Sequence, residues 1–174
     1  MNCSDIHPDF RLNGQAFKEN QLCELAIGLI RDGEPHQQDL GNLILQWFDE
    51  KDYIILMTSG TTGKPKEIKL QKEAVKNSAL ATGAYFQLSP KDSALLCLPT
   101  RYIAGKLMFV RAIILGLHLD FVNPSSNPLE KSKKTYDFVA MVPLQVINSI
   151  NHLNQIKKLI IGGAKLDQPI KELI

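Results

Sequence analysis

Cysteine is scarce in this sequence, and no long apolar run is present. The three cysteines, Cys3, Cys23 and Cys97, are an odd number at wide spacing and form no C-x-x-C pair. This pattern excludes a disulfide framework and a cysteine metal or redox motif, so we expect reduced thiols. No segment approaches the roughly 20 apolar residues of a membrane span. Residues 1–5 lack the basic start and apolar stretch of a signal peptide, and we therefore expect a cytoplasmic protein.

Histidine spacing and net charge exclude further classes of function. The four histidines follow neither the H-x₃-H nor the H-E-x-x-H pattern, so no metal site built on histidine is predicted. The net charge is +2 and the basic residues form no long block, which gives no support to nucleic-acid or membrane-surface binding. With 44% hydrophobic residues in 174, the chain can bury one core.

The first 50 residues predict a hairpin and two helices. Asn13-Gly14 lies between short alternating flanks, which favours a type I′ turn. Apolar residues then recur at helical spacing in two runs, 22–30 and 40–48, and Gly33 and Pro35 separate them. We assign residues 1–50 to this N-terminal hairpin and helix unit, and residues 51–174 to an α/β subdomain.

From residue 53 onwards, strand and helix patterns alternate. The run 53–57 is apolar throughout, as in a strand covered on both faces. A one-sided strand at 67–70 and a helix at 72–86 follow. Further strands are predicted at 94–98, 118–122, 138–142 and 159–161, and further helices at 103–115, which Gly116 ends, and at 144–153. This alternation predicts an α/β fold with a mostly parallel sheet flanked by helices.

The last nine residues, 166–174, begin a helical pattern with an acidic first turn and then stop. Their apolar residues have no downstream partner in this sequence. We therefore expect the chain to be a fragment of a longer protein.

A loop rich in glycine and hydroxyl groups follows the apolar run at 53–57. It comprises Thr58, Ser59, Gly60, Thr61, Thr62, Gly63, Lys64, Pro65 and Lys66. Glycine lets the backbone turn and direct N–H groups inward, and hydroxyls add donors. Two lysines supply positive charge. A loop of this composition after a strand is typical of an anion-binding site.

Two alternatives compete for this loop. A Walker A loop needs glycines five apart and Ser or Thr after its lysine, whereas Gly60 and Gly63 are three apart and Pro65 follows Lys64. The other alternative is an ordinary surface turn, since these residue types are common in loops. Composition alone does not separate that turn from a phosphate site.

The string from Met57 to Lys66 resembles, almost letter for letter, the phosphate-loop signature of the adenylate-forming (AMP-binding) superfamily. Members include acyl-CoA synthetases, adenylation domains of peptide synthetases, and luciferases. The resemblance implies that the loop residues 58–64 and Lys66 bind ATP, with Thr58 and Lys66 in catalytic roles. One departure is Glu67, because the family usually has glycine there.

Two later segments resemble further family motifs. Residues 98–105, which include Arg101, Tyr102 and Gly105, resemble L-P-x-x-H-x-x-G at the acid-binding pocket, although Tyr102 replaces the usual histidine. Residues 159–166 resemble the G-G-A-x-L segment along the adenine, which assigns Gly162, Gly163 and Ala164 to the nucleotide. A strand-to-helix turn explains that Gly-Gly equally well.

Within the superfamily, the segments 94–108 and 136–145 resemble the short o-succinylbenzoate–CoA ligases of menaquinone synthesis. This resemblance implies that the protein uses ATP, Mg²⁺ and the co-substrate CoA, and that it binds a small-molecule acid. A homodimer is a possible oligomeric state. The acid would be bound near Arg101, Tyr102, Gly105 and Lys106. Its second carboxylate needs a cation, and Arg101, Lys106 and Arg111 are the candidates. Helical spacing places Lys106 and Arg111 about 140° apart, so at most one should face the pocket, and we favour Lys106.

The chain stops before several family elements. The Y-G-x-T-E segment that helps to hold Mg²⁺, the ribose-binding aspartate and the C-terminal lysine domain do not occur in it. We therefore expect the main magnesium ligand to lie beyond this chain, and residues 1–174 alone not to complete acyl-adenylation. The remaining alternatives are a ligase for another aryl or fatty acid or an amino acid, and a non-catalytic nucleotide-binding module.

Overall fold

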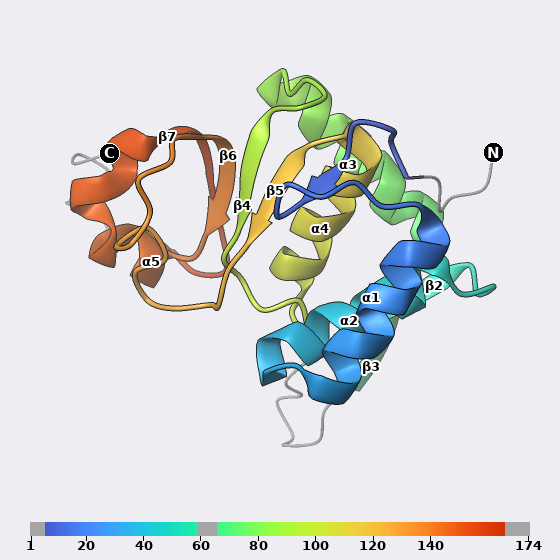
Figure 1. Ribbon diagram of the computed structural model, residues 1–174. Coiled ribbons are helices and arrows are strands. Elements are labelled where there is room, and N and C mark those ends of the chain that lie inside the picture. The colour runs from blue at the N-terminus through green and yellow to red at the C-terminus, as the bar shows by residue number, and fades with distance from the viewer. Residues whose placement is uncertain (1–5, 59–65, 166–174) are drawn as a thin grey trace.

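The computed structural model describes residues 6–58 and 66–165 (Figure 1). Its centre is a five-stranded sheet in the order β1-β5-β4-β6-β7, and every pair of neighbours is parallel. The predicted α/β class with a mostly parallel sheet is confirmed. The five strands are β1 (Arg11–Leu12), β4 (Ser93–Leu96), β5 (His118–Phe121), β6 (Tyr136–Met141) and β7 (Ile156–Ile161).

The strand order reverses beside β4. The chain passes from β4 to β5 on one side, and then crosses back to place β6 on the other side of β4. In open α/β sheets, ligands bind in the crevice outside the carboxyl ends of the strands at such a reversal. The topology therefore indicates a site beyond the ends of β4 and β6.

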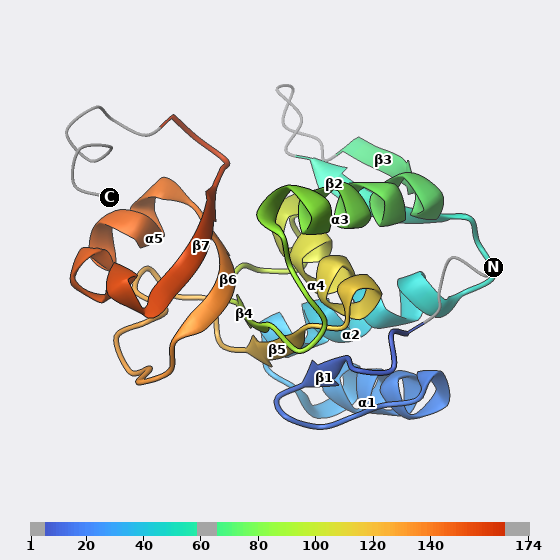
Figure 2. The same ribbon diagram turned by 90° about the horizontal axis from the view of Figure 1, so that it is seen from above.

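Helices cover both faces of this sheet, as Figure 2 shows. One face carries α3 (Lys72–Phe86) and α4 (Ile103–Leu115), and the other carries α5 (Pro143–Asn148) and the 3₁₀ helix η1 (Ile150–Gln155). Each face of the sheet has its own hydrophobic core, and neighbouring residues of β4 point to opposite faces. Leu96 packs in the core that contains Phe109 of α4, and Leu95 packs in the core that contains Val146 of α5. Both faces are thus apolar, as a covered parallel sheet requires.

The two predicted N-terminal helices are confirmed as α1 (Glu19–Asp32) and α2 (Pro35–Phe48). They pack against each other, and a Cβ on Gly41 would lie only 2.6 Å from the carbonyl oxygen of Ala26, so glycine permits the close approach. Trp47 of α2 is fully buried in the same core as Phe109. The helix pair therefore extends the core on the α4 side of the sheet.

The predicted type I′ turn is present, but the hairpin around it is minimal. Asn13 and Gly14 both have positive φ, 48° and 80°, and a single bridge joins Leu12 to Gln15. Arg11 and Leu12 instead pair in parallel with β5. The boundary at residue 50 between the N-terminal unit and the α/β subdomain stays a prediction. β1, which belongs to residues 1–50, adds two residues to the sheet of the α/β subdomain.

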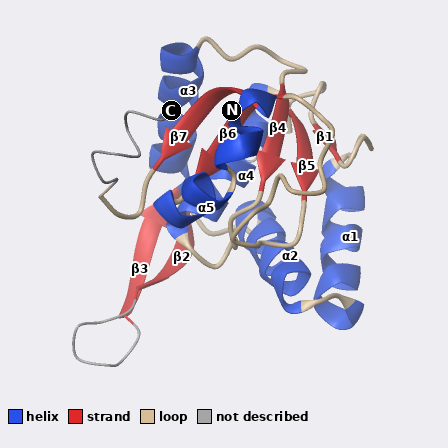
Figure 3. Cartoon of the chain, turned by 90° about the vertical axis from the view of Figure 1, so that its left-hand side faces the viewer, coloured by secondary structure: helices blue, strands red, loops and turns tan. Residues whose placement is uncertain are grey.

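β2 (Tyr53–Thr58) and β3 (Lys66–Gln71) form a separate antiparallel ribbon (Figure 3). The expectation that residues 53–57 are covered on both faces is wrong: Ile54 and Leu56 are buried, whereas Tyr53 and Ile55 are only half-buried. The ribbon lies outside the parallel sheet, so only one of its faces packs on the core. At its base, Lys72 donates from Nζ to the backbone and carboxylate oxygens of Asp49, both at 2.8 Å.

Most predicted boundaries agree with the structure. The helices at 72–86 and 103–115 begin and end as predicted, and Gly116 ends α4 with φ of 73°. The predicted helix at 144–153 is divided at Ser149, whose Oγ donates to Oδ1 of Asn127 at 2.9 Å. The predicted C-terminal helix lies outside the described residues. Among the helices that the structure describes, none is both long enough and apolar enough to cross a membrane.

Candidate functional site

A pocket of about 540 Å³ lies beyond the carboxyl ends of the parallel strands. We call it the strand-end pocket. It is lined by the segment after β4 with the start of α4, the loop after β5, the start of α5, and the turn after β7. The lining residues are Leu98, Pro99, Tyr102, Ile103, Ala104, Gly105, Pro124, Ser125, Ser126, Val142, Leu144, Gln145 and Gly163. It thus occupies the position that the strand order indicates.

The sequence places α4 tightly against the end of β4. A Cβ on Gly105 would lie 2.4 Å from the carbonyl oxygen of Pro99, so only glycine fits there without a shift. Tyr102 precedes the helix as its N-cap, and the residue is 53% exposed. The first turn of α4 therefore begins at the pocket wall, where the positive end of the helix dipole favours negative charge.

The Gly-Gly segment reaches the same pocket from β7. The N–H of Gly162 donates to the carbonyl oxygen of Met141 at 3.1 Å, which continues the β6–β7 pairing past the end of β7. Gly163 then turns with φ of 88° and lines the pocket. The structure thus brings Tyr102 and Gly105 together with Gly163, although Tyr102 and Gly163 are 61 residues apart in the chain. Ala164 follows in the same turn and is exposed.

Gln145 holds the loop after β5 against the sheet. Its side-chain amide donates to the carbonyl oxygens of Cys97, at 3.0 Å, and Ser125, at 2.9 Å. The residue is only 5% exposed, so these two bonds join the end of β4 to the pocket loop inside the protein. Residues 124–126, Leu144 and Gln145 were not predicted as site residues. Leu144 and Gln145 lie in the segment 136–145 that resembles the ligases, but the link to this pocket comes from their position after a strand end, which becomes meaningful once the strand order is known.

Lys106 lies next to the strand-end pocket along α4 but does not line it. Its side chain is buried, with only 5% of the residue exposed. Burial lowers the pKa of the Lys106 ammonium, and the negative charge of Asp39 on α2 opposes that shift. Asp39 is therefore the neighbouring charge that favours the protonated form of Lys106.

The other two candidate cations also lie outside the lining of the pocket. Arg101 is exposed, pairs with Asp39 at 3.9 Å, and lies over the ring of Tyr102 at 5.1 Å from its centroid. It lines a smaller cavity of about 280 Å³ between α2 and the segments after β4 and β5. Arg111 is 9% exposed, and its Nε has no hydrogen-bond partner within the described ranges. Burial lowers the pKa of its guanidinium.

The predicted phosphate loop is described only at its two ends. Thr58 and Lys66 face each other as the last pair of the β2–β3 ribbon. Ser59, Gly60, Thr61, Thr62, Gly63 and Lys64 lie outside the described residues, so their predicted contacts remain predictions. Within residues 6–58 and 66–165, no group of three or more His, Cys, Asp or Glu side chains could hold a metal ion.

Comparison with known proteins gives the family. The model of the AMP-binding enzyme family matches residues 17–172. A Mycobacterium tuberculosis protein named probable 2-succinylbenzoate–CoA ligase is 27% identical over 150 residues, which cover 78% of this chain and 39% of the relative. This chain therefore spans less than half of that relative's length.

Solved structures agree. The crystal structure of an acyl-CoA synthetase (AMP-forming)/AMP-acid ligase II-like protein from Dyadobacter fermentans is similar with a TM-score of 0.73 and 32% identity, over 86% of this chain and 45% of that one. The o-succinylbenzoate coenzyme A synthetase of Bacillus subtilis in complex with AMP shares the fold at 20% identity, with a TM-score of 0.58 over 68% of this chain and 26% of that one. On the strength of the family match, the chain belongs to the AMP-binding enzymes.

Proposed function

We propose that the complete protein is an ATP-dependent acid–CoA ligase, and that its acid is o-succinylbenzoate. The observation that carries this proposal is the strand-end pocket, where the two segments that resemble the acid and adenine motifs meet at one cavity. The curated relatives named as 2-succinylbenzoate–CoA ligases support the choice of acid.

The proposed reaction has two steps. A carboxylate oxygen of the acid attacks the α-phosphorus of ATP, and the bond from that phosphorus to the bridging oxygen breaks to release pyrophosphate. The thiol of CoA then attacks the carbonyl carbon of the acyl-adenylate, AMP leaves, and the thiol proton is released. A carboxylate is already nucleophilic, so the task of the protein is to position the reactants and to stabilise charge.

Each segment has a proposed role in this scheme. The loop from Thr58 to Lys66 holds the β- and γ-phosphates, and its two lysines offset the charge of the departing pyrophosphate. The hydrocarbon wall of the strand-end pocket accepts the aromatic ring, and the turn at Gly162, Gly163 and Ala164 lies along the adenine. The loop lysines would act beside Mg²⁺, which would supply further positive charge to the phosphates and whose main protein ligand we expect beyond this chain.

The second carboxylate of o-succinylbenzoate needs a cation, and we propose Lys106 first. It is buried on the helix that forms the pocket wall, where an added anion would have a large effect. Arg111 is the alternative, because its Nε lacks a partner among the described residues. Replacing Lys106 or Arg111 by Gln separates the two. The variant that loses affinity for o-succinylbenzoate but keeps its KM for ATP identifies the cation.

The decisive experiment is acid-dependent ATP–pyrophosphate exchange with the full-length protein. o-Succinylbenzoate should give the strongest signal in a panel that includes benzoate, a medium-chain fatty acid and several amino acids. CoA should then convert the adenylate to the thioester. A strong response to an aliphatic acid alone would refute the choice of acid, and no exchange with any acid would refute the ligase.

A matched pair of variants on α5 tests the pocket. Leu144 lines the strand-end pocket and is 58% exposed, whereas Ile147 is 43% exposed on the same helix and does not line it. Leu144→Asp should lower kcat/KM for the acid about tenfold or more, because a charge replaces apolar contact area. Ile147→Asp should leave kcat/KM unchanged. Equal effects of both variants would place the acid elsewhere.

A ligase for another aryl or fatty acid is the second candidate. The observation that favours it is the lining of the strand-end pocket, in which none of the described residues is charged. A monocarboxylic acid needs no cation at the far end of its pocket. The acid panel distinguishes the two candidates directly.

A further inference from the structure

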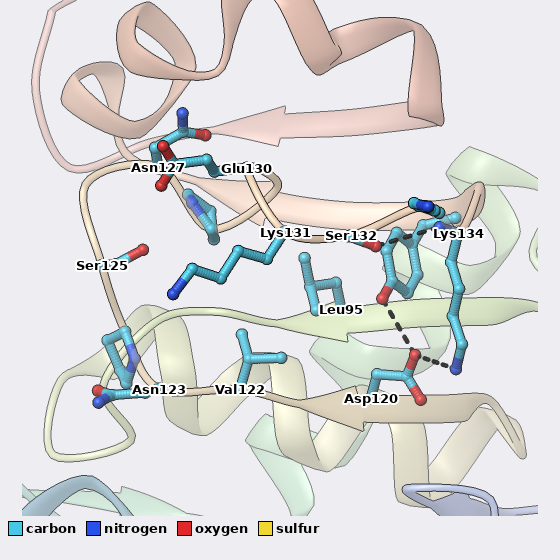
Figure 4. A pocket seen from close by; sticks show the side chains of 14 residues that line it. Leu95, Asp120, Val122, Asn123, Ser125, Asn127, Glu130, Lys131, Ser132 and Lys134 are labelled. Carbon is cyan, nitrogen blue, oxygen red and sulfur yellow. Dashed lines mark hydrogen bonds and ion pairs between the residues drawn. The ribbon is translucent and has the colours of Figure 1, made fainter.

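The connection from β5 to β6 leaves a second and larger cavity. Parallel strands are usually joined through a helix, but residues 122–135 contain no helix. They arch over the sheet face opposite α3 and α4, and enclose a cavity of about 690 Å³ (Figure 4). We call it the crossover cavity. It shares Pro124 and Ser125 with the strand-end pocket, and apart from Leu95 and Tyr136 its lining lies outside the motifs discussed above.

The floor of the crossover cavity is apolar and fixed. Leu95 of β4, 1% exposed, and Tyr136 of β6, 3% exposed, belong to the buried core on this face, and Val122 packs against that core. Figure 4 shows Leu95 and Val122 below the loop that bears Lys131. Such a floor favours the flat or compact apolar part of a small molecule.

Some charged side chains of the crossover cavity are paired with a neighbour and others are not. Asp120 is neutralised, because Nζ of Lys134 lies 2.6 Å from its carboxylate and the Tyr136 hydroxyl donates to the same oxygen at 3.0 Å. Lys131 has no hydrogen bond or ion pair with another described residue, and its side chain extends across the cavity in Figure 4. The lining holds three lysines and two acids, which leaves one net positive charge.

The loop that bears Lys131 also carries neutral polar side chains. Asn123, Ser125 and Asn127 lie along the same loop. Oδ1 of Asn127 accepts from Ser149, which holds this part of the loop in place. An ammonium with the Ser125 hydroxyl near it, as in Figure 4, suits an anionic group of one charge. Glu130 is the opposing feature, because its carboxylate is not neutralised by a described residue and disfavours an anion.

We propose that the crossover cavity binds a small organic monoanion, a carboxylate or sulfonate with a compact apolar part. Lys131 contacts the anionic group, and Leu95, Val122 and the Tyr136 ring contact the apolar part. This site is separate from the proposed ligase reaction and does not depend on it.

The test is titration of the full-length protein with 2-naphthalenesulfonate, which resembles such a ligand but cannot be adenylated. We expect saturable binding of one molecule, and clearly weaker binding of the neutral naphthalene-2-sulfonamide. Lys131→Gln should weaken the sulfonate about threefold to tenfold, as for one partly exposed charge contact. Glu130→Gln should strengthen it. Both side chains are exposed, so neither change should disturb the fold.

Two variants locate the probe. Lys76→Gln removes a lysine from α3, on the opposite face of the sheet, and should leave the affinity unchanged. Leu144→Asp alters the strand-end pocket and should also leave it unchanged. Binding that is lost in Leu144→Asp but kept in Lys131→Gln would place the probe in the strand-end pocket and overturn the proposal. Absence of binding, or equal affinity for the neutral sulfonamide, would overturn it as well.

Discussion

The ammonium of Lys72 is the most completely buried ion-paired cation in the part of the chain that the structure describes. Only 4% of its side chain is exposed, and Nζ lies 2.8 Å from both the carbonyl and a carboxylate oxygen of Asp49. Asp49 follows the last residue of α2, so the lysine satisfies a helix end and ties the base of the β2–β3 ribbon to it.

Lys72→Met should therefore lower the free energy of unfolding by about 1–3 kcal/mol, since it leaves a charged hydrogen-bond acceptor without its partner. Lys76→Met, on the same helix, should change it by less than about 0.5 kcal/mol. Urea denaturation measures both. Equal stability of the two variants would show that water replaces the lysine at no cost.

Asp137 makes stability depend on pH. Partial burial raises the pKa of its carboxyl, but hydrogen bonds from Lys157 and Ser93 outweigh burial and lower the pKa from 3.8 to about 2. A lowered folded-state pKa stabilises the protein above the unfolded pKa, and this contribution is lost as the pH falls from about 4 to about 2. The carboxylate accepts from Lys157 Nζ at 2.7 Å and from Ser93 Oγ at 2.6 Å.

Asp137→Asn should accordingly destabilise the protein by about 1–2 kcal/mol at neutral pH, after allowance for solvent screening. The difference from wild type should shrink as the pH falls below about 4. Denaturation at pH 7, 4 and 2.5 measures it. A difference that stays constant with pH would mean that the carboxylate gains nothing from its charge.

At the scale of elements, the junction of β4 with α4 depends on one glycine. Gly105→Ala places a methyl group 2.4 Å from the carbonyl oxygen of Pro99, so the helix must move away from the strand end. We expect a loss of about 1–3 kcal/mol, as for other overpacked sites.

Gly28→Ala is the matched control within α1, because a Cβ there meets nothing within 4 Å. It should raise stability by about 0.5–1 kcal/mol through helix propensity. Thermal denaturation of both variants measures the contrast. Similar stability of the two would show that the β4–α4 junction is loose.

Elements with a strong local pattern were predictable, and those that depend on pairing were not. Gly116 and the apolar stripe of 103–115 define α4 without reference to any other segment. β7 begins at Ile156, three residues before its predicted start, because Lys157 and Lys158 hide the strand pattern that pairing with β6 imposes. The apolar run of β2 suggested two covered faces, whereas only antiparallel pairing with β3 decides that one face packs on the core.

At the scale of the whole molecule, the two cores on opposite faces of the sheet should unfold together. Trp47, the only tryptophan, reports on one core, and Cys97 reports on the other. Burial raises the pKa of the Cys97 thiol to about 12, so it should resist thiol reagents in the folded state.

In a variant with Cys3 and Cys23 changed to serine, labelling of Cys97 should follow urea unfolding. Its midpoint should equal that of Trp47 fluorescence, because domains of this size usually unfold in one step. Labelling of Cys97 well below the fluorescence midpoint would show that the face under α5 opens independently.

The sequence by itself determined the fold class, the order of most elements and the family, since each rests on local periodicity or on one contiguous string around 57–66. It also pointed to Tyr102, Gly105 and Gly163, though in separate motifs. Only the tertiary structure placed these three at one pocket, added Leu144 and Gln145 to it, and left Lys106 buried outside its lining. The physical reason is that the pocket is made by a reversal of strand order, which joins residues far apart in the chain and leaves no local pattern.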